Sequence, residues 1–136
     1  MTARRFACIL LSAALLFTCF ASALATVKPQ YDHAEDVYAS ISISGTKASV
    51  SGKIIPVSST ETRKVSIIVY LQRKENGKWR SLDSWSGSAT NATARASGSK
   101  TIEKGYEYRA LSVGRISTAE GVLLERPTKA SSAKAY

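Results

Sequence analysis

Apolar and polar residues alternate strictly from Val37 to Ser44, and the return of this pattern further along predicts a β-rich chain. The first alternating segment covers 37–44, where Val, Ala and Ile take every second position and Tyr and Ser fill the positions between. Because successive side chains on a strand point to opposite faces, this segment is expected to be a half-buried strand. The same period returns over 48–54. Pro56 ends that strand or keeps it at a sheet edge, since proline cannot donate to a ladder.

A hairpin is predicted at Asn76-Gly77, after the segment 63–74, which is rich in β-branched and aromatic residues. A two-residue loop there fixes the register of the two strands. The expected opposite pairs are Glu75 with Lys78, Lys74 with Trp79, Leu71 with Leu82 and Ile68 with Trp85. The same register sets Arg73 against Arg80, a like-charge pair that a β-bulge would relieve.

Opposed residues share a sheet face, so the predicted hairpin has two distinct sides. The natural core side carries Val65, Ile67, Val69, Leu71 and Leu82. The other side is aromatic, with polar groups between the rings, and carries Tyr70, Trp79, Trp85 and Asp83. Rings spaced along a sheet can stack on sugars while Asp83 supplies hydrogen bonds, which makes this side a candidate ligand-stacking face. The structural alternative is that an edge strand or tail buries the rings.

The second half of the chain is patterned less evenly. Residues 86–100 fit either a poor edge strand or a long loop, and 106–116 are expected to form a strand with a bulge near Ala110. Tyr106 or Tyr108 is placed to form a tyrosine corner, in which the ring hydroxyl bonds back to the preceding backbone.

These segments predict an all-β fold, because no helix period follows residue 25 and six or seven short strands are separated by turn residues. A single antiparallel β-sandwich of immunoglobulin or fibronectin type III topology is the first choice, and a small barrel is the second. The expected division is a signal peptide over 1–25, a flexible lead-in over 26–36, the sandwich over 37–126, and a C-terminal tail or edge strand over 127–136.

The first 25 residues read as a secretory signal peptide. Arg4 and Arg5 precede an apolar run, and small residues allow cleavage after Ala23 or Ala25. Both cysteines of the chain, Cys8 and Cys19, lie within this leader. The expected mature chain of 136 − 25 = 111 residues is therefore free of thiols and destined for an extracellular location, where its stability rests on a hydrophobic core.

The chain is strongly basic, with 19 Lys and Arg against 10 Asp and Glu. Removing Arg4 and Arg5 with the leader leaves 17 − 10 = +7. Such a charge attracts polyanions such as anionic wall polymers. The cations are scattered and form no basic block, so a solvated surface is the simpler interpretation, and no nucleic-acid partner is expected.

Catalytic machinery is not apparent in the sequence. His33 is the single histidine, and no nucleotide-binding glycine pattern is present. Asp32, His33, Glu35 and Asp36 lie close together in the sequence but match no zinc or EF-hand spacing. The chain is therefore interpreted as a non-enzyme without a cofactor or metal.

Several short motifs follow one another in an order that carries a family resemblance: Leu71-Gln72-Arg73-Lys74, Gly77-Lys78-Trp79, Ser84-Trp85-Ser86, Lys104-Gly105-Tyr106 and Tyr108-Arg109. The chain resembles a family of small secreted β-proteins of Gram-positive bacteria, classed as a domain of unknown function. The resemblance implies a secreted bacterial β-sandwich and implies no activity, cofactor or catalytic residue.

Two functions remain open. The first is an extracellular binding or cell-surface module, expected to be monomeric, with a cell-wall polymer, a glycan or another extracellular protein as its partner. The alternative is a secreted cationic effector of the bacteriocin type, favoured by the charge and the small size but not by any amphipathic membrane-active segment. A secreted enzyme is the least favoured class.

Overall fold

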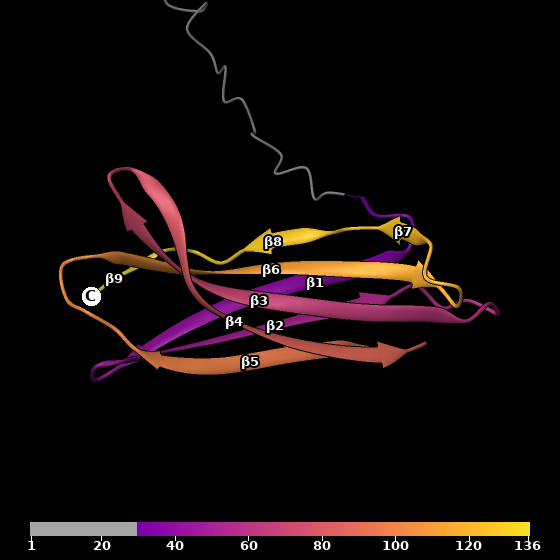
Figure 1. Cartoon of the computed structure of the whole chain (residues 1–136), viewed down its shortest axis with the longest axis horizontal. Helices are drawn as coiled ribbons and strands as arrows, with labels where there is room; N and C mark the ends of the chain where they lie inside the picture. Colours follow the sequence, from indigo (N-terminus) through magenta and orange to yellow (C-terminus); the bar gives the residue numbers. More distant parts are fainter. Residues whose placement is uncertain (1–29) are drawn as a thin grey trace, which may run out of the picture.

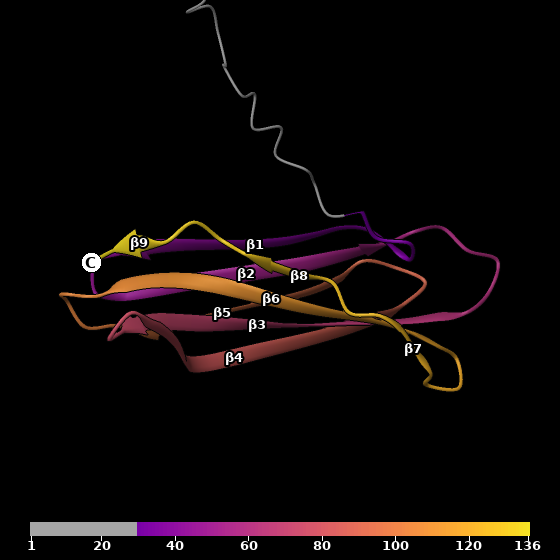
Figure 2. The ribbon, with the colours of Figure 1, turned by 90° about the horizontal axis from the view of Figure 1, so that it is seen from above.

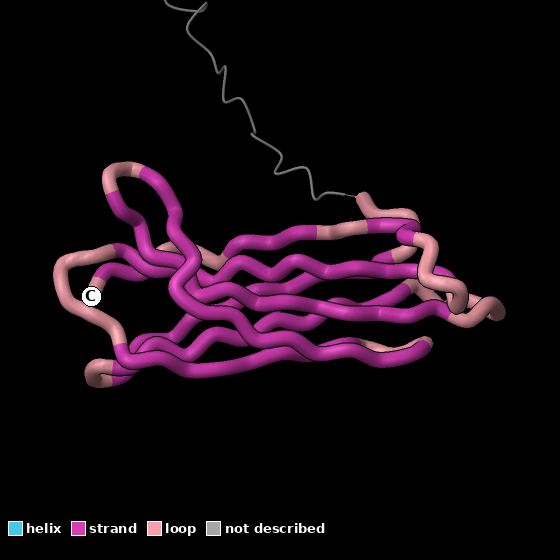
Figure 3. Tube along the Cα trace, viewed as in Figure 1, coloured by secondary structure: helices cyan, strands magenta, loops and turns pink. Residues whose placement is uncertain are grey.

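Nine β-strands make up two antiparallel sheets in the computed structural model, which describes residues 30–136 (Figures 1 and 3). The expected leader, with Cys8, Cys19 and the candidate cleavage sites, lies outside the described residues. Sheet A has the order β1-β2-β5, with β1 at Ala34–Ser44, β2 at Lys47–Pro56 and β5 at Ala94–Thr101.

Sheet B is built around β6 (Glu107–Thr118) and β3 (Arg63–Glu75), which pair along most of their length. β4 (Lys78–Thr90) pairs with the other edge of β3. Three short strands line the free side of β6: β7 (Leu123–Glu125), β8 (Thr128–Ala130) and β9 (Lys134–Ala135). The two sheets form the layers of an antiparallel sandwich, which Figure 2 shows from above.

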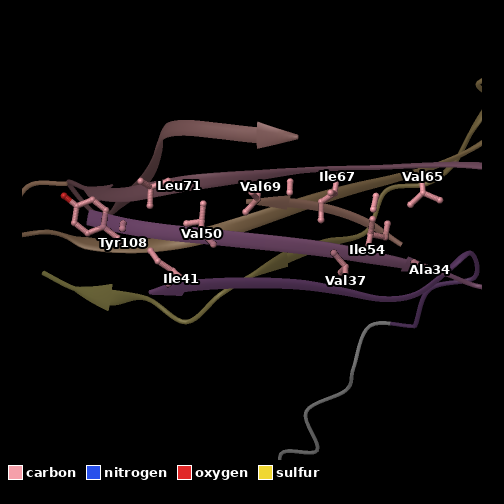
Figure 4. Close-up of a cluster of buried hydrophobic side chains, with 14 of the residues drawn as sticks. Ala34, Val37, Ile41, Val50, Ile54, Val65, Ile67, Val69, Leu71 and Tyr108 are labelled. Carbon is pink, nitrogen blue, oxygen red and sulfur yellow. The ribbon is translucent and has the colours of Figure 1, made fainter. Parts of the chain in front are cut away.

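The core lies between the sheets, where the inward side of each strand is apolar (Figure 4). The alternation predicted for β1, β2 and β3 is confirmed by their burial: every second residue along most of β2 and β3 is buried, and every second residue of β1 from Val37 on is buried or half-buried. The inward set of β3 is the predicted one: Val65, Ile67, Val69 and Leu71. Removing this much apolar area from water is the main stabilising contribution in a domain without disulfides.

β6 alternates regularly, so the predicted bulge near Ala110 is wrong. Its pairing with β3 runs without a register shift, because Ser112 and Gly114 take inward positions that the apolar pattern did not mark. The buried Ser112 hydroxyl donates to the backbone carbonyl of Tyr38, 2.7 Å away in the other sheet. A buried hydroxyl is tolerated here because its hydrogen bond is made.

Tyr108 is the second residue of β6 and makes the hydroxyl contacts predicted for a tyrosine corner. Its ring is fully buried, and its hydroxyl donates to the carbonyl of Glu103 at 2.6 Å and accepts from the Glu103 amide at 3.1 Å. These bonds fasten the β5–β6 connection to the start of β6.

The region 86–100, predicted as a poor edge strand or a loop, is two good strands joined by a turn. β4 continues to Thr90, Asn91 turns with a φ of 52°, and β5 begins at Ala94. The small residues of this region allow β4 of sheet B and β5 of sheet A to pack closely against each other. A Cβ on Gly87 would overlap the Arg95 carbonyl of β5, and a Cβ on Gly98 would overlap the indole of Trp85.

At the edge of the sandwich away from β4 and β5, Glu125 of β7 links the two sheets. Its carboxylate accepts hydrogen bonds from the backbone amides of Asp32, His33 and Ala34 at 2.8–2.9 Å. The Tyr31 hydroxyl also donates to the Thr128 carbonyl at 3.1 Å. The expected flexible lead-in over 26–36 is therefore wrong for its last residues, because β1 starts at Ala34 and Glu125 holds the residues just before it.

Candidate functional site

The β3–β4 hairpin has the predicted turn and the predicted first pairs. Asn76 and Gly77 have φ values of 51° and 75°, as a type I′ turn requires. Glu75 pairs with Lys78 and Lys74 pairs with Trp79. Beyond the core, this end of the hairpin turns away from the line of the other strands (Figure 1).

Past Ser81 the predicted register is wrong, because Leu82 is an extra residue in β4. Gln72 pairs with Ser81 but Leu71 pairs with Asp83, so the bulge falls at Leu82. A one-residue shift moves every later side chain to the opposite face. Trp85 consequently pairs with the buried Val69 and lies on the inward side of the sheet.

The predicted face is thus divided between two sides of sheet B. Tyr70 and Trp79 remain on the outer face, whereas Trp85 and Asp83 lie on the inward side. Trp85 packs against the core over Gly98, which agrees with the structural alternative for this ring. Asp83 lies near the end of the core and forms an ion pair with Lys100 of β5 at 3.6 Å.

Arg109 of β6 lies beside Trp79 on the outer face, a neighbour that no local sequence pattern predicts. The centre of its guanidinium lies 4.3 Å from the centroid of a Trp79 ring. Its Nε donates to Gln72 Oε1 at 2.8 Å, and Gln72 Nε2 donates to the Ser81 hydroxyl at 3.2 Å. Gln72 is only 7% exposed, so the arginine is held by a nearly buried amide.

Arg109 has no carboxylate partner among residues 30–136. Partial burial lowers the pKa of its guanidinium from the usual value, because desolvation disfavours the charged form. The acidic group nearest in the pairing, Glu107, forms an ion pair with Lys74 at 3.4 Å. The Trp79–Arg109 cluster, defined as Trp79, Arg109, Gln72 and Lys74, therefore presents a positively charged aromatic surface.

Tyr70 lies one step along the same outer face and is half-buried. It pairs with Ser84 on one side and with Leu111 on the other. The next row of the face holds Ile68 and Val113. The outer face of sheet B is therefore apolar and aromatic in its middle and positively charged at the hairpin end.

A network of ion pairs fixes the hairpin end on its inward side. Arg73 binds Glu75 through Nε and Nη2, contacts Glu103 at 3.0 Å and lies 4.3 Å from the Tyr106 ring. The hydrogen bond with Glu75 raises the pKa of Arg73, and the same bond lowers the pKa of Glu75. These contacts tie β3 to the connection between β5 and β6 on the face opposite to Trp79.

The acidic residues near His33 do not converge on a common point. No group of three or more His, Cys, Asp or Glu side chains in the described part of the chain is placed to hold a metal ion. Likewise, no helix long and apolar enough to cross a membrane occurs within 30–136.

No family model and no curated protein matches this chain. Among solved structures it is similar to Bacteroides uniformis β-glucuronidase 2 covalently bound to cyclophellitol-6-carboxylate aziridine, with 13% sequence identity and a TM-score of 0.45. The likeness covers 71% of this chain and 13% of that one, so the chain spans only a small part of the enzyme's length. The resemblance to a secreted Gram-positive family stays a prediction.

Proposed function

We propose that this protein is a secreted, non-enzymatic binding module that attaches to an anionic glycan or cell-wall polymer through the Trp79–Arg109 cluster. The observation that carries the proposal is Arg109, a partly desolvated cation without a carboxylate partner in the described chain. Partly buried arginines in proteins usually pair with a carboxylate. An arginine that has no such partner and lies beside an indole therefore favours the binding of an anionic ligand.

The chemistry of the cluster suits an acidic sugar. Arg109 donates to Gln72 through Nε, and this bond orients the guanidinium. The two terminal nitrogens of Arg109 therefore remain available to bind a carboxylate or phosphate. The Trp79 indole beside it offers a flat apolar surface for a sugar ring. Lys74 lies on the same face, where Glu107 pairs with its charge, so Arg109 supplies the net positive charge of the cluster.

We also infer a fibronectin type III-like topology for the sandwich. β4 pairs with β3 and therefore belongs to the same sheet as β6. In immunoglobulin-type sandwiches, the strand that follows strand C can likewise join the sheet that contains strands C and F. The Tyr108 hydroxyl bonds support the same assignment. Secretion rests on the leader predicted from the sequence, and a sandwich of this kind is common among extracellular binding domains.

Two single-tryptophan variants test the proposal, since the chain has only two tryptophans. In Trp85→Phe the emission reports Trp79, and in Trp79→Phe it reports Trp85. We expect isolated Gram-positive cell walls to shift or quench the Trp79 emission and to leave the Trp85 emission unchanged. Cosedimentation with the same walls should persist in part at 1 M salt. The affinity for the walls should fall about tenfold in Arg109→Ala, because a charge-assisted contact is lost.

Arg126→Ala is the matched control, because it removes one positive charge from an exposed residue between β7 and β8. If this control weakens binding as much as Arg109→Ala does, attraction is non-specific and the cluster has no special role. If the Trp79 emission stays constant while neighbouring bacteria are killed, the cationic effector is the better account of the protein.

A further inference from the structure

The outer face of sheet A carries a regular array of side chains that the Trp79–Arg109 cluster does not involve. Strand pairing aligns its residues in rows that run across β1, β2 and β5. One row consists of Tyr38, Lys53 and Arg95. The next two rows consist entirely of serines: Ser40, Ser51 and Ser97, then Ser42, Ser49 and Ser99.

The face is hollowed over the serine rows because serine is much smaller than the residues that border it. A depression of about 630 Å³ extends from Tyr38, Lys53 and Arg95 onto the first serine row and reaches Ser86 of the adjacent strand β4. A second depression of about 470 Å³ continues over both serine rows. Together they form a shallow trough along the strands, which we call the serine trough.

The hydroxyl groups on the trough floor are ordered by one another. The Ser40 and Ser51 oxygens lie 2.6 Å apart, and those of Ser49 and Ser99 lie 2.9 Å apart. Each such pair uses one hydroxyl hydrogen and keeps another, along with free lone pairs. Rows on one face repeat about every 6.8 Å along a strand and about 4.8 Å between strands, so the floor offers both donors and acceptors at regular spacing.

One end of the trough is positively charged. Within residues 30–136 neither Lys53 nor Arg95 forms an ion pair, and Lys53 Nζ lies 4.3 Å from the centroid of the Tyr38 ring. The acidic residue nearest in the pairing is Asp36, which lies opposite Ile55 and accepts a hydrogen bond from the Val37 amide. No acidic residue lines either depression.

We propose that the serine trough is a second binding site, and that it takes an extended polysaccharide chain carrying carboxylate groups. Sugar hydroxyls match the donor and acceptor floor, while Lys53 and Arg95 pair with a carboxylate at the end of the trough. Tyr38 borders the same end, where it is 43% exposed and Lys53 Nζ lies over its ring. The site lies on the opposite outer face of the sandwich from the Trp79–Arg109 cluster and is independent of the function proposed for that cluster.

Affinity electrophoresis through gels containing polygalacturonate, with dextran gels as the neutral comparison, tests the site. We expect the protein to be retarded by polygalacturonate and not by dextran. The double variant Lys53→Ala/Arg95→Ala should weaken this binding by about tenfold or more, as the loss of one or two charge-assisted contacts implies. Ser51→Leu should weaken it similarly without a change of charge, because the larger side chain fills the trough floor.

The matched control is Lys78→Ala/Lys104→Ala, which removes the same charge from two exposed residues, one at the start of β4 and one between β5 and β6. Each variant is checked by thermal unfolding, and exposed positions on a sheet face are expected to leave the fold intact. Equal weakening by the control, or unchanged binding in Ser51→Leu, would overturn the proposal. The same variants are also measured in a Trp79→Ala background, where Lys53→Ala/Arg95→Ala and Ser51→Leu should weaken the remaining retardation by the same factor, so failure at this site and failure at the Trp79–Arg109 cluster are separable.

Discussion

Arg73 and Arg80 lie directly opposite each other across the β3–β4 hairpin, and the Glu75 carboxylate contacts both guanidinium groups. The like-charge pair predicted from the sequence is therefore present, but a bulge does not relieve it. A carboxylate from the hairpin itself lies between the two cations, and the bulge occurs further along β4, at Leu82.

Replacing Glu75 by Gln should lower the thermal unfolding midpoint at pH 7 by several degrees, because the carboxylate between Arg73 and Arg80 is lost and only Glu103 still pairs with Arg73. The bond from Arg73 lowers the pKa of Glu75 in the folded state. Its contribution to stability is thus present above about pH 4.3, the ordinary Glu value, and is lost as the pH falls through the folded-state pKa. The difference in midpoint between wild type and Glu75→Gln should shrink toward pH 3. Glu61→Gln, which removes a carboxylate that is 72% exposed from its pair with Arg63, should change the midpoint little at any pH.

Gly87→Ala should destabilise the fold by roughly 1–3 kcal/mol, as overpacking does in a well-packed interior. The added methyl group would meet the backbone carbonyl of Arg95, which cannot rotate away as a side chain could. Urea unfolding measures the effect. Ser86→Ala, one residue earlier and on the outer face of β4, is the neighbouring control and should lie near wild type. Equal stability of the two variants would mean that β4 and β5 are not in close contact.

Removing the hydroxyl in Tyr108→Phe should cost about 1–3 kcal/mol, since the Glu103 carbonyl and amide both lose their partner beside a buried ring. Tyr106→Phe serves as the comparison because the Tyr106 hydroxyl makes no hydrogen bond within the described residues. Thermal unfolding of the two variants side by side measures the difference. A Tyr108→Phe protein as stable as Tyr106→Phe would argue against this corner as a stabilising element.

Glu125→Gln should release the residues that precede β1. A glutamine side chain has one acceptor oxygen in place of two and adds donors that face the amides of Asp32, His33 and Ala34. Hydrogen exchange of these amides should accelerate about tenfold or more, consistent with the loss of charge-assisted bonds. Exchange in the middle of β2 should not change, and Glu120→Gln provides a substitution of the same type in a neighbouring turn. Unaltered exchange at residues 32–34 would contradict the role assigned to Glu125.

The sequence was sufficient to predict the sandwich and the first half of the hairpin, because period-two alternation and an Asn-Gly turn are local signals. The register failed at Leu82 because no Gly or Pro marks the bulge, and a shift of one residue transferred Trp85 and Asp83 to the inward side. β5 was difficult to predict for a different reason. Its Ala and Gly residues have low strand propensity, so the local sequence does not predict a strand. Small residues are nevertheless needed there because β4 and Trp85 pack closely against β5.

The candidate sites depend on pairings between distant segments. Arg109 comes next to Trp79 only through the pairing of β6 with β3 and its bond to Gln72, 37 positions away. Alternating serines in β1 predict one polar face of a strand. The serines of three strands form common rows because of the register between β1, β2 and β5, and no local pattern encodes that register.

The position of Glu125 has a mechanical consequence. The described chain enters the sandwich beside β7, at the end away from the β3–β4 turn (Figure 1). A pull applied between residue 30 and a ligand held at Trp79 would run lengthwise along the strands. Through Glu125 the tension passes from the segment before β1 into β7, then into β6 and β3, so sheet B carries it directly. The ladder bonds between β6 and β3 would be loaded together in shear, a geometry that resists rupture better than peeling bonds one at a time.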